Sequence, residues 1–281
     1  MSTRRENRLQ LGLIAALLAS AALAWAATGE LMSGMDAGPG TDPGTLGYFL
    51  GVWVVMMAAM MLPSTVPMVV TYARMQAGRQ ALGKAAVAGA TAIFVGGYLI
   101  AWTGAGLLGY GIFELGRTVT GNLFAWDGVG PYLAGAILAG AGLYQLTRVK
   151  GACLRHCRSP STSLMRSRRP GGPAGALRMG VLHGGWCVGC CWALMASLFA
   201  LGVMSIGWMA FIAALVAIER LLPRKEVAIR GTALLLLGLG LMVALVPAAV
   251  PGLTLPGSSA AMSEMAPGPA MEASPGTGAM P

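Results

Sequence analysis

Long apolar segments separated by short polar ones run along most of the chain. Because a helix of about 20 apolar residues is long enough to cross the hydrocarbon core of a bilayer, each such segment is a candidate span. Seven of them lie at about 9–28, 46–70, 85–113, 131–149, 180–204, 207–222 and 228–250. The pattern therefore predicts an all-α fold, namely a polytopic transmembrane helical bundle of about seven spans.

Three regions differ in composition. Residues 1–29 carry an arginine-rich start before an apolar core, which is typical of an N-terminal transmembrane segment or signal anchor. We favour an uncleaved helix there over a cleaved signal peptide. Residues 46–250 form the helical membrane domain that carries the candidate metal ligands. Residues 251–281 are rich in Pro, Gly, Ala and Met, a composition that predicts a disordered C-terminal tail.

Charge supports the membrane interpretation. The chain is 56% hydrophobic and only 10% charged, which is too apolar for an ordinary soluble domain. A net charge of +9 in a soluble protein would suggest nucleic-acid binding. Here we expect no nucleic-acid partner, because the basic residues cluster in alternate connecting segments, as the positive-inside rule requires of cytoplasmic ones.

Seven spans that start from a cytoplasmic N-terminus place the C-terminal tail in the periplasm or outside the cell. On this topology the segment from Arg148 to Arg178 is cytoplasmic, and its prolines, glycines and arginines predict a solvated loop. Arg220 and Arg230 lie at the same face, whereas Arg117 falls outside.

The candidate chemistry centres on the stretch HGGWCVGCCWALM in the fifth predicted span. His183, Cys187, Cys191 and Met195 are four residues apart, and Cys190 follows Cys187 by three. At about 100° per residue these positions form one stripe on a helix. Soft metal ligands therefore share one helix face.

Two further thiols, Cys153 and Cys157, lie four residues apart just past the fourth predicted span. They fall at the cytoplasmic face, where the fifth span begins. Since the cytoplasm is normally reducing, we expect free thiols, a metal site or a redox pair rather than structural disulfides. We interpret His156, between them, as a solvated residue rather than a ligand.

A methionine cluster occupies the second predicted span, in WVVMMAAMMLPSTVP. Its members are four residues apart in two pairs and cover one side of the helix: Met56, Met57, Met60 and Met61. Pro63 and Pro67 then interrupt the backbone hydrogen bonds, which frees carbonyl groups inside the bundle. Methionine is also a common gap filler in apolar cores, so structural packing remains the alternative for this cluster.

Thiolate and thioether sulfur select Cu(I), whereas thiolate with imidazole also suits Zn(II). We therefore predict a Cu(I) site, with zinc as the second choice. Cys187, Cys190 and Cys191 are the principal ligands, supported by His183 or by Cys153 and Cys157. The intramembrane relay for the ion consists of the thioether groups of Met56, Met57, Met60, Met61 and Met195. Glu219 is a further candidate ligand, although a salt bridge is the simpler interpretation.

The same stretches carry a resemblance. WVVMMAAMMLPSTVP, YQLTRVKGACLRHCRSP and HGGWCVGCCWALMASLFALGVMSIGWM, followed by Glu219, resemble in sequence and order a bacterial family of predicted metal-binding integral membrane proteins, a domain of unknown function. The similarity spans about residues 46–226. It implies a multi-pass protein of the bacterial inner membrane. The metal site that it implies includes the ligands above except Met195, and adds Gln145 and Lys150.

We therefore predict an integral membrane protein that binds Cu(I) for transfer, transport or delivery. Its expected partners are the lipid bilayer, the metal ion, and a metallochaperone or another membrane protein; we expect no catalytic residues. One alternative is a membrane thiol-disulfide oxidoreductase that uses Cys187 and Cys190. Another is an assembly subunit with a structural metal.

Overall fold

The computed structural model describes residues 2–32, 44–81, 89–120, 129–158, 172–203, 205–222 and 224–250. Within these ranges the chain is all-helical, as the apolar pattern predicts, and no strand is present. The α-helices are α1 (Ser2–Met32), α2 (Leu46–Ala81), α3 (Ala90–Thr120), α4 (Gly130–Gln145), α5 (Arg148–Arg158), α7 (Pro173–Leu201), α8 (Ile206–Leu221) and α9 (Lys225–Leu245). The predicted C-terminal tail, 251–281, lies outside the described residues.

Five of the described helices are long and apolar enough to cross a membrane. These segments are Gln10–Met32, Leu46–Gln80, Ala90–Thr118, Pro173–Leu201 and Glu226–Leu245. The other two predicted spans correspond to α4 and α8, which are 16 residues long each. Their axial length is about 24 Å, less than the roughly 30 Å of a hydrocarbon core.

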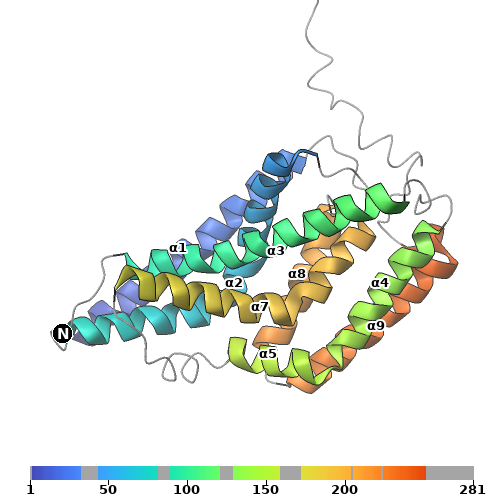
Figure 1. The fold of residues 1–281 in the computed structure, drawn as a ribbon. Helices are drawn as coiled ribbons and strands as arrows, with labels where there is room; N and C mark the ends of the chain where they lie inside the picture. Colours follow the sequence, from blue (N-terminus) through green and yellow to red (C-terminus); the bar gives the residue numbers. More distant parts are fainter. Residues whose placement is uncertain are drawn as a thin grey trace, which may run out of the picture.

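The helices pack in neighbouring pairs, with α1 beside α2, α3 beside α7 and α4 beside α9 (Figure 1). Two of these pairs approach so closely that a side chain would not fit between them. A Cβ atom on Gly184 would lie 2.6 Å from the Cβ of Ala101, and one on Gly135 would lie 2.6 Å from the carbonyl oxygen of Gly240. Small residues thus allow backbone contact, as in helix pairs packed within lipid.

Helix α2 continues through both of its prolines, to Ala81. The sequence predicts that Pro63 and Pro67 interrupt the backbone hydrogen bonds, and the structure keeps one continuous helix across both prolines. Nearby hydroxyl groups donate to backbone oxygens, from Ser64 to Met61 and from Thr65 to Leu62, each at 2.9 Å. Each proline leaves the carbonyl four residues earlier without its helical donor, here those of Ala59 and Pro63. The two hydroxyl bonds therefore lie next to the freed carbonyl groups and do not replace the missing donors.

The predicted solvated loop after α4 is wrong for its first part, because Arg148–Arg158 forms helix α5. The arginine content suggested solvation, but one side of the helix buries Lys150, Cys153 and Leu154 against the bundle. This helix lies across the ends of α4 and α8, next to the middle of α7 (Figure 1). The end of the predicted loop is wrong as well, because α7 begins at Pro173. Residues 159–171 of the loop lie outside the described residues.

One large buried cluster contains the methionines of α2, the cysteines of α7 and Cys153 of α5. By contrast, α1, α3 and α9 expose leucines on their outer faces. Leu23 is 71% exposed, Leu108 66% and Leu234 71%. The sulfur-containing side chains therefore face the interior, while aliphatic ones cover the outside.

Candidate metal centre

Three thiols of α7 lie together inside the bundle. Cys187, Cys190 and Cys191 are 0, 1 and 2% exposed. Their sequence spacing places them on one face of α7, and this face is covered by α5, α3 and α8. All five cysteines of the chain are free thiols.

A fourth thiol comes from α5. The Sγ atom of Cys157 lies 3.7 Å from that of Cys190, which in turn lies 3.3 Å from that of Cys191. Sulfur atoms that share a tetrahedral metal ion are about 3.8 Å apart, because each metal–sulfur bond is about 2.3 Å long. Small side-chain adjustments would therefore let these thiols bind one ion.

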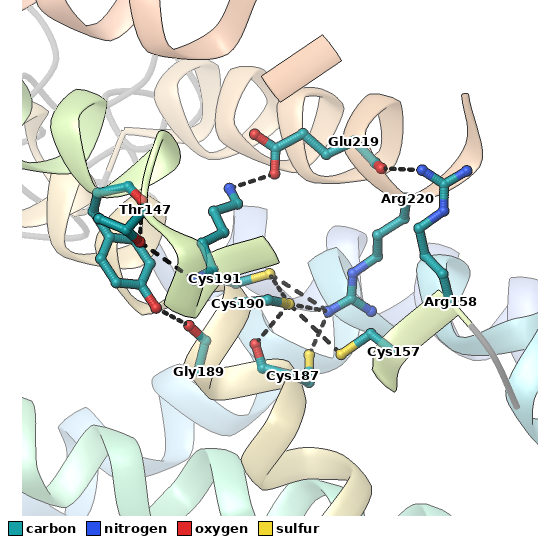
Figure 2. A network of polar contacts seen from close by, with 11 residues as sticks. Thr147, Cys157, Arg158, Cys187, Gly189, Cys190, Cys191, Glu219 and Arg220 are labelled. Atoms are coloured by element: carbon teal, nitrogen blue, oxygen red, sulfur yellow. Dashed lines mark hydrogen bonds and ion pairs between the residues drawn. The ribbon is translucent and has the colours of Figure 1, made fainter. Parts of the chain in front are cut away.

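The side chain at the centre of the thiols is Arg220 of α8 (Figure 2). Its Nη2 atom lies 2.6 Å from the Sγ of Cys187, 3.4 Å from that of Cys191 and 3.5 Å from that of Cys190. Its Nη1 atom donates to Ser64 of α2 at 3.1 Å. The arginine thus joins the cysteine helix to the end of the methionine cluster.

Sequence reasoning missed this position of Arg220. The positive-inside pattern placed the residue at the cytoplasmic surface, but it is only 8% exposed. Arg220 lies near the end of an apolar helix, and this position does not indicate whether its side chain points to solvent or into the bundle. Tyr98 of α3 was also missed; its hydroxyl lies 3.0 Å from the Sγ of Cys187.

Glu219, next to Arg220 in the chain, turns away from the thiols. Its Oε2 accepts from the Nζ of Lys150 at 2.6 Å, and the two side chains are 2% and 0% exposed. The expected salt bridge is therefore present, and its partner comes from α5. Because a buried charge is costly without a partner, the pair fixes α5 against α8.

Arg158 strengthens the same attachment at the other end of α5. Its guanidinium donates to the backbone oxygens of Glu219 at 3.1 Å and of Leu222 at 2.6 Å. These carbonyl groups lie at the C-terminus of α8, where a helix has unsatisfied acceptors and a negative dipole end. The neighbouring residue Cys157 is thereby held beside α7.

The two thiols of α5 differ in their surroundings. Cys157 is half-buried and faces Cys190, whereas Cys153 is buried and its sulfur lies against the backbone at Gly189. Burial raises the pKa of the Cys153 thiol, and the nearby Cys190 raises it further. Because the sulfur of Cys157 faces a thiol of α7 and that of Cys153 faces backbone, Cys153 is the weaker candidate of the two.

The two histidines pack against aromatic rings. His183 is 5% exposed, and its ring lies 5.9 Å from those of Phe94 and Tyr98. His156 stacks on Trp186 at 4.2 Å, so the expectation that it is freely solvated is wrong. The indole ring of Trp186 on α7 provides the flat surface for this stacking. The basic sequence around His156 gives no indication of that contact.

The predicted thioether ligands are all buried. Met56, Met57, Met60 and Met61 are 0–3% exposed, and Met195 is 3% exposed. They belong to the same buried cluster as the α7 thiols, so they point into the bundle. This placement is compatible with both a relay for Cu(I) and ordinary packing.

In the described part of the chain, no group of three or more His, Cys, Asp or Glu side chains has the arrangement of a metal site. The thiol sulfurs converge on the guanidinium of Arg220 instead. Of the two residues that the resemblance adds, Lys150 pairs with Glu219. Gln145 is 2% exposed, and within the described ranges neither atom of its amide group has a hydrogen-bond partner.

The fold and the site together define a class of protein, an all-helical chain that surrounds a cluster of soft sulfur ligands with helices of membrane-spanning length. Comparison with protein families agrees with the soft-metal chemistry. The chain belongs to the PpoB2 family, described as a copper chaperone, which it matches over residues 50–243. No curated protein and no solved structure matches the chain.

The matched range contains every predicted ligand, from Met56 to Met195, and also Lys150, Glu219 and Arg220. Membership of this family therefore shows a copper-related role for the chain. It agrees with the resemblance to metal-binding proteins that the motifs carry.

Proposed function

We propose that this protein is an integral membrane copper chaperone that binds Cu(I) through thiols of α7 and α5 and passes it on. The observation that carries the proposal is the convergence of four sulfur atoms from two helices. Cys187, Cys190 and Cys191 supply three, and Cys157 supplies the fourth. Three buried thiols at one point are an unusual choice for packing alone, since each is a small side chain with reactive chemistry.

Copper in the +1 state fits this ligand set better than other cellular metals. Cu(I) is a soft ion, and thiolate and thioether groups are soft ligands. In the described residues the thiols have no carboxylate partner of the kind that hard ions prefer, because the nearby Glu219 is engaged with Lys150. Membership of a copper chaperone family supports the same ion as cargo.

Insertion in the bacterial inner membrane is supported by the five candidate spans and by the leucines exposed on α1, α3 and α9. Exposed aliphatic surface of this kind is stable in lipid and unfavourable in water. The positive-inside rule favours a cytoplasmic N-terminus. On the seven-span topology, in which α4 and α8 also cross the membrane, α5 lies at the cytoplasmic boundary and the buried thiols lie beneath it.

The buried methionines of α2 would extend the route away from the thiols. Arg220 contacts both the α7 cysteines and Ser64, one turn after Met60 and Met61. Thioethers bind Cu(I) more weakly than thiolates do, which suits transient contacts during transfer. We propose that the ion moves between the methionine cluster and the thiols, with a metallochaperone or another membrane protein as the exchange partner.

A membrane thiol oxidoreductase remains the second candidate, and the 3.7 Å separation of the Cys157 and Cys190 sulfurs favours it. These atoms would have to approach to about 2.05 Å to form a disulfide. The distinguishing result is a reversible two-electron couple in protein free of metal, which the oxidoreductase requires and the copper chaperone does not.

The direct test of the proposal is element analysis of protein purified in detergent from alkali-washed membranes under reducing conditions. We expect the protein in the membrane fraction and copper bound to it in stoichiometric amounts. X-ray absorption should report sulfur neighbours at the short distances of Cu(I) thiolates. Protein that is recovered with zinc or with no metal would contradict the proposed cargo.

The α5 thiols allow a matched comparison. Cys157→Ser should lower the affinity for Cu(I) by about tenfold or more, because it removes a thiol that faces Cys190. Cys153→Ser, on the same helix, should lower it much less, since its sulfur lies against backbone. Competition with a Cu(I)-selective chelator measures both. A larger loss in Cys153→Ser would show that the wrong thiol has been assigned.

A further inference from the structure

A positive charge lies in the middle of the candidate copper ligands. The guanidinium of Arg220 is within 3.5 Å of three thiol sulfurs of α7 and is buried with them. Figure 2 shows it beside the sulfurs of the α7 cysteines, with the sulfur of Cys157 nearby. Any cargo ion bound by these thiols therefore lies close to a second, permanent cation.

The positive charge of Arg220 is not cancelled by the carboxylate nearest to it in the sequence. Glu219 is adjacent in sequence, but its carboxylate points to the other side of α8 and pairs with Lys150. Among the described residues, the salt bridges do not include Arg220. Since a buried guanidinium needs a partner, the thiol groups are the acceptors that balance it.

We propose that Arg220 determines which ions the thiol cluster accepts, by favouring a monovalent soft cation over a divalent one. This inference rests on the proposed function, in which the same thiols bind the cargo ion. Repulsion from the guanidinium acts on both ions, but it is twice as large for Zn(II) as for Cu(I) at the same position. The discrimination therefore holds whatever number of thiolates binds the ion.

The charge balance agrees with a two-thiolate site. One Cu(I) ion, two thiolates and the guanidinium sum to zero, whereas Zn(II) in the same place leaves a buried charge of +1. Loading releases the two thiol protons to solvent, and no electron is transferred. Arg220 thus adds a preference based on charge to the preference of sulfur for soft ions.

The test compares the affinities for Cu(I) and Zn(II), measured with chromogenic chelators on the full-length protein in detergent without oxygen. Arg220→Met and Arg220→Gln remove the charge, while Arg220→Lys keeps it. Arg230→Met removes a charge from the exposed surface of α9 and is the control. We expect the ratio of Cu(I) to Zn(II) affinity to fall by about 100-fold in the two neutral variants. In Arg220→Lys and Arg230→Met it should change by less than about threefold.

An unchanged ratio in a folded neutral variant, or an equal fall in Arg230→Met, would overturn the inference. A wild type that binds neither ion would overturn the proposed function itself, before any variant is compared. Should both neutral variants fail to fold, the wild type is titrated with Ag(I) and Cd(II). The ratio of Ag(I) to Cd(II) affinity of the protein must exceed the same ratio for the free dithiol dithiothreitol by about 100-fold. Equal ratios overturn the inference.

Discussion

Replacing Cys187, Cys190 and Cys191 together with serine is expected to abolish copper binding. The change removes three buried sulfurs that lie within 3.5 Å of one point, the Nη2 atom of Arg220. Serine hydroxyls are hard ligands and bind Cu(I) poorly. Because loss of a residue that merely supports a ligand already costs about 10–100-fold, loss of three ligands should lower the affinity by well over about 100-fold. Element analysis of protein purified beside the wild type measures the effect.

The control for this variant is the replacement of Ser197 by alanine. Ser197 is also buried on α7, but its hydroxyl donates to the backbone oxygen of Ala193 and does not reach the thiols. It should retain the copper content of the wild type. Copper retained in the triple variant at the wild-type level would place the binding site elsewhere, with the methionines of α2 as the first region to examine.

Replacing Lys150 by methionine is expected to destabilise the protein by about 3–5 kcal/mol, because it leaves Glu219 buried without its cation. The midpoint of denaturation, followed by helical circular dichroism in detergent, should fall accordingly. Arg230→Met breaks an exposed pair with Glu226 at 4.0 Å and should cost less than about 1 kcal/mol.

A double variant separates the charge from the contact. Lys150→Met combined with Glu219→Leu removes both charges and replaces them with apolar side chains of similar size. Apolar replacement of a whole buried pair is often neutral or stabilising, so most of the lost stability should return. A double variant as unstable as the single one would show that packing, rather than the unpaired carboxylate, explains the loss.

The apolar pattern was sufficient to predict the helical fold and the order of its helices. All seven predicted segments begin within about seven residues of the start of a helix in the structure, because long apolar runs leave few alternatives to a helix. The count of seven spans stays a prediction, since α4 and α8 are short. The pattern failed at α5, where hydrophobicity is low and the burial of Lys150 depends on a carboxylate 69 residues away.

Spacing within α7 correctly indicated which cysteines share a face, because helical periodicity is a local property. The positions of Arg220 and Tyr98 depend on how α8 and α3 are rotated against α7, which no local pattern specifies. The methionines illustrate a third case. Their burial could be anticipated from the apolar span, but their role in copper transfer stays a prediction.

The close packing of α3 and α7 constrains how a cargo ion can reach the thiols. Gly184 meets the backbone of α3 with no room for a side chain, so α7 is fixed along that side. Helix α5 is held by the buried salt bridge of Lys150, by the hydrogen bonds of Arg158 and by Cys153 and Leu154, which pack against the bundle. Cys157 on α5 is half-buried, whereas the other four cysteines are buried. If the thiols bind copper as proposed, we expect the ion to meet the sulfur of Cys157 first when it enters and last when it leaves.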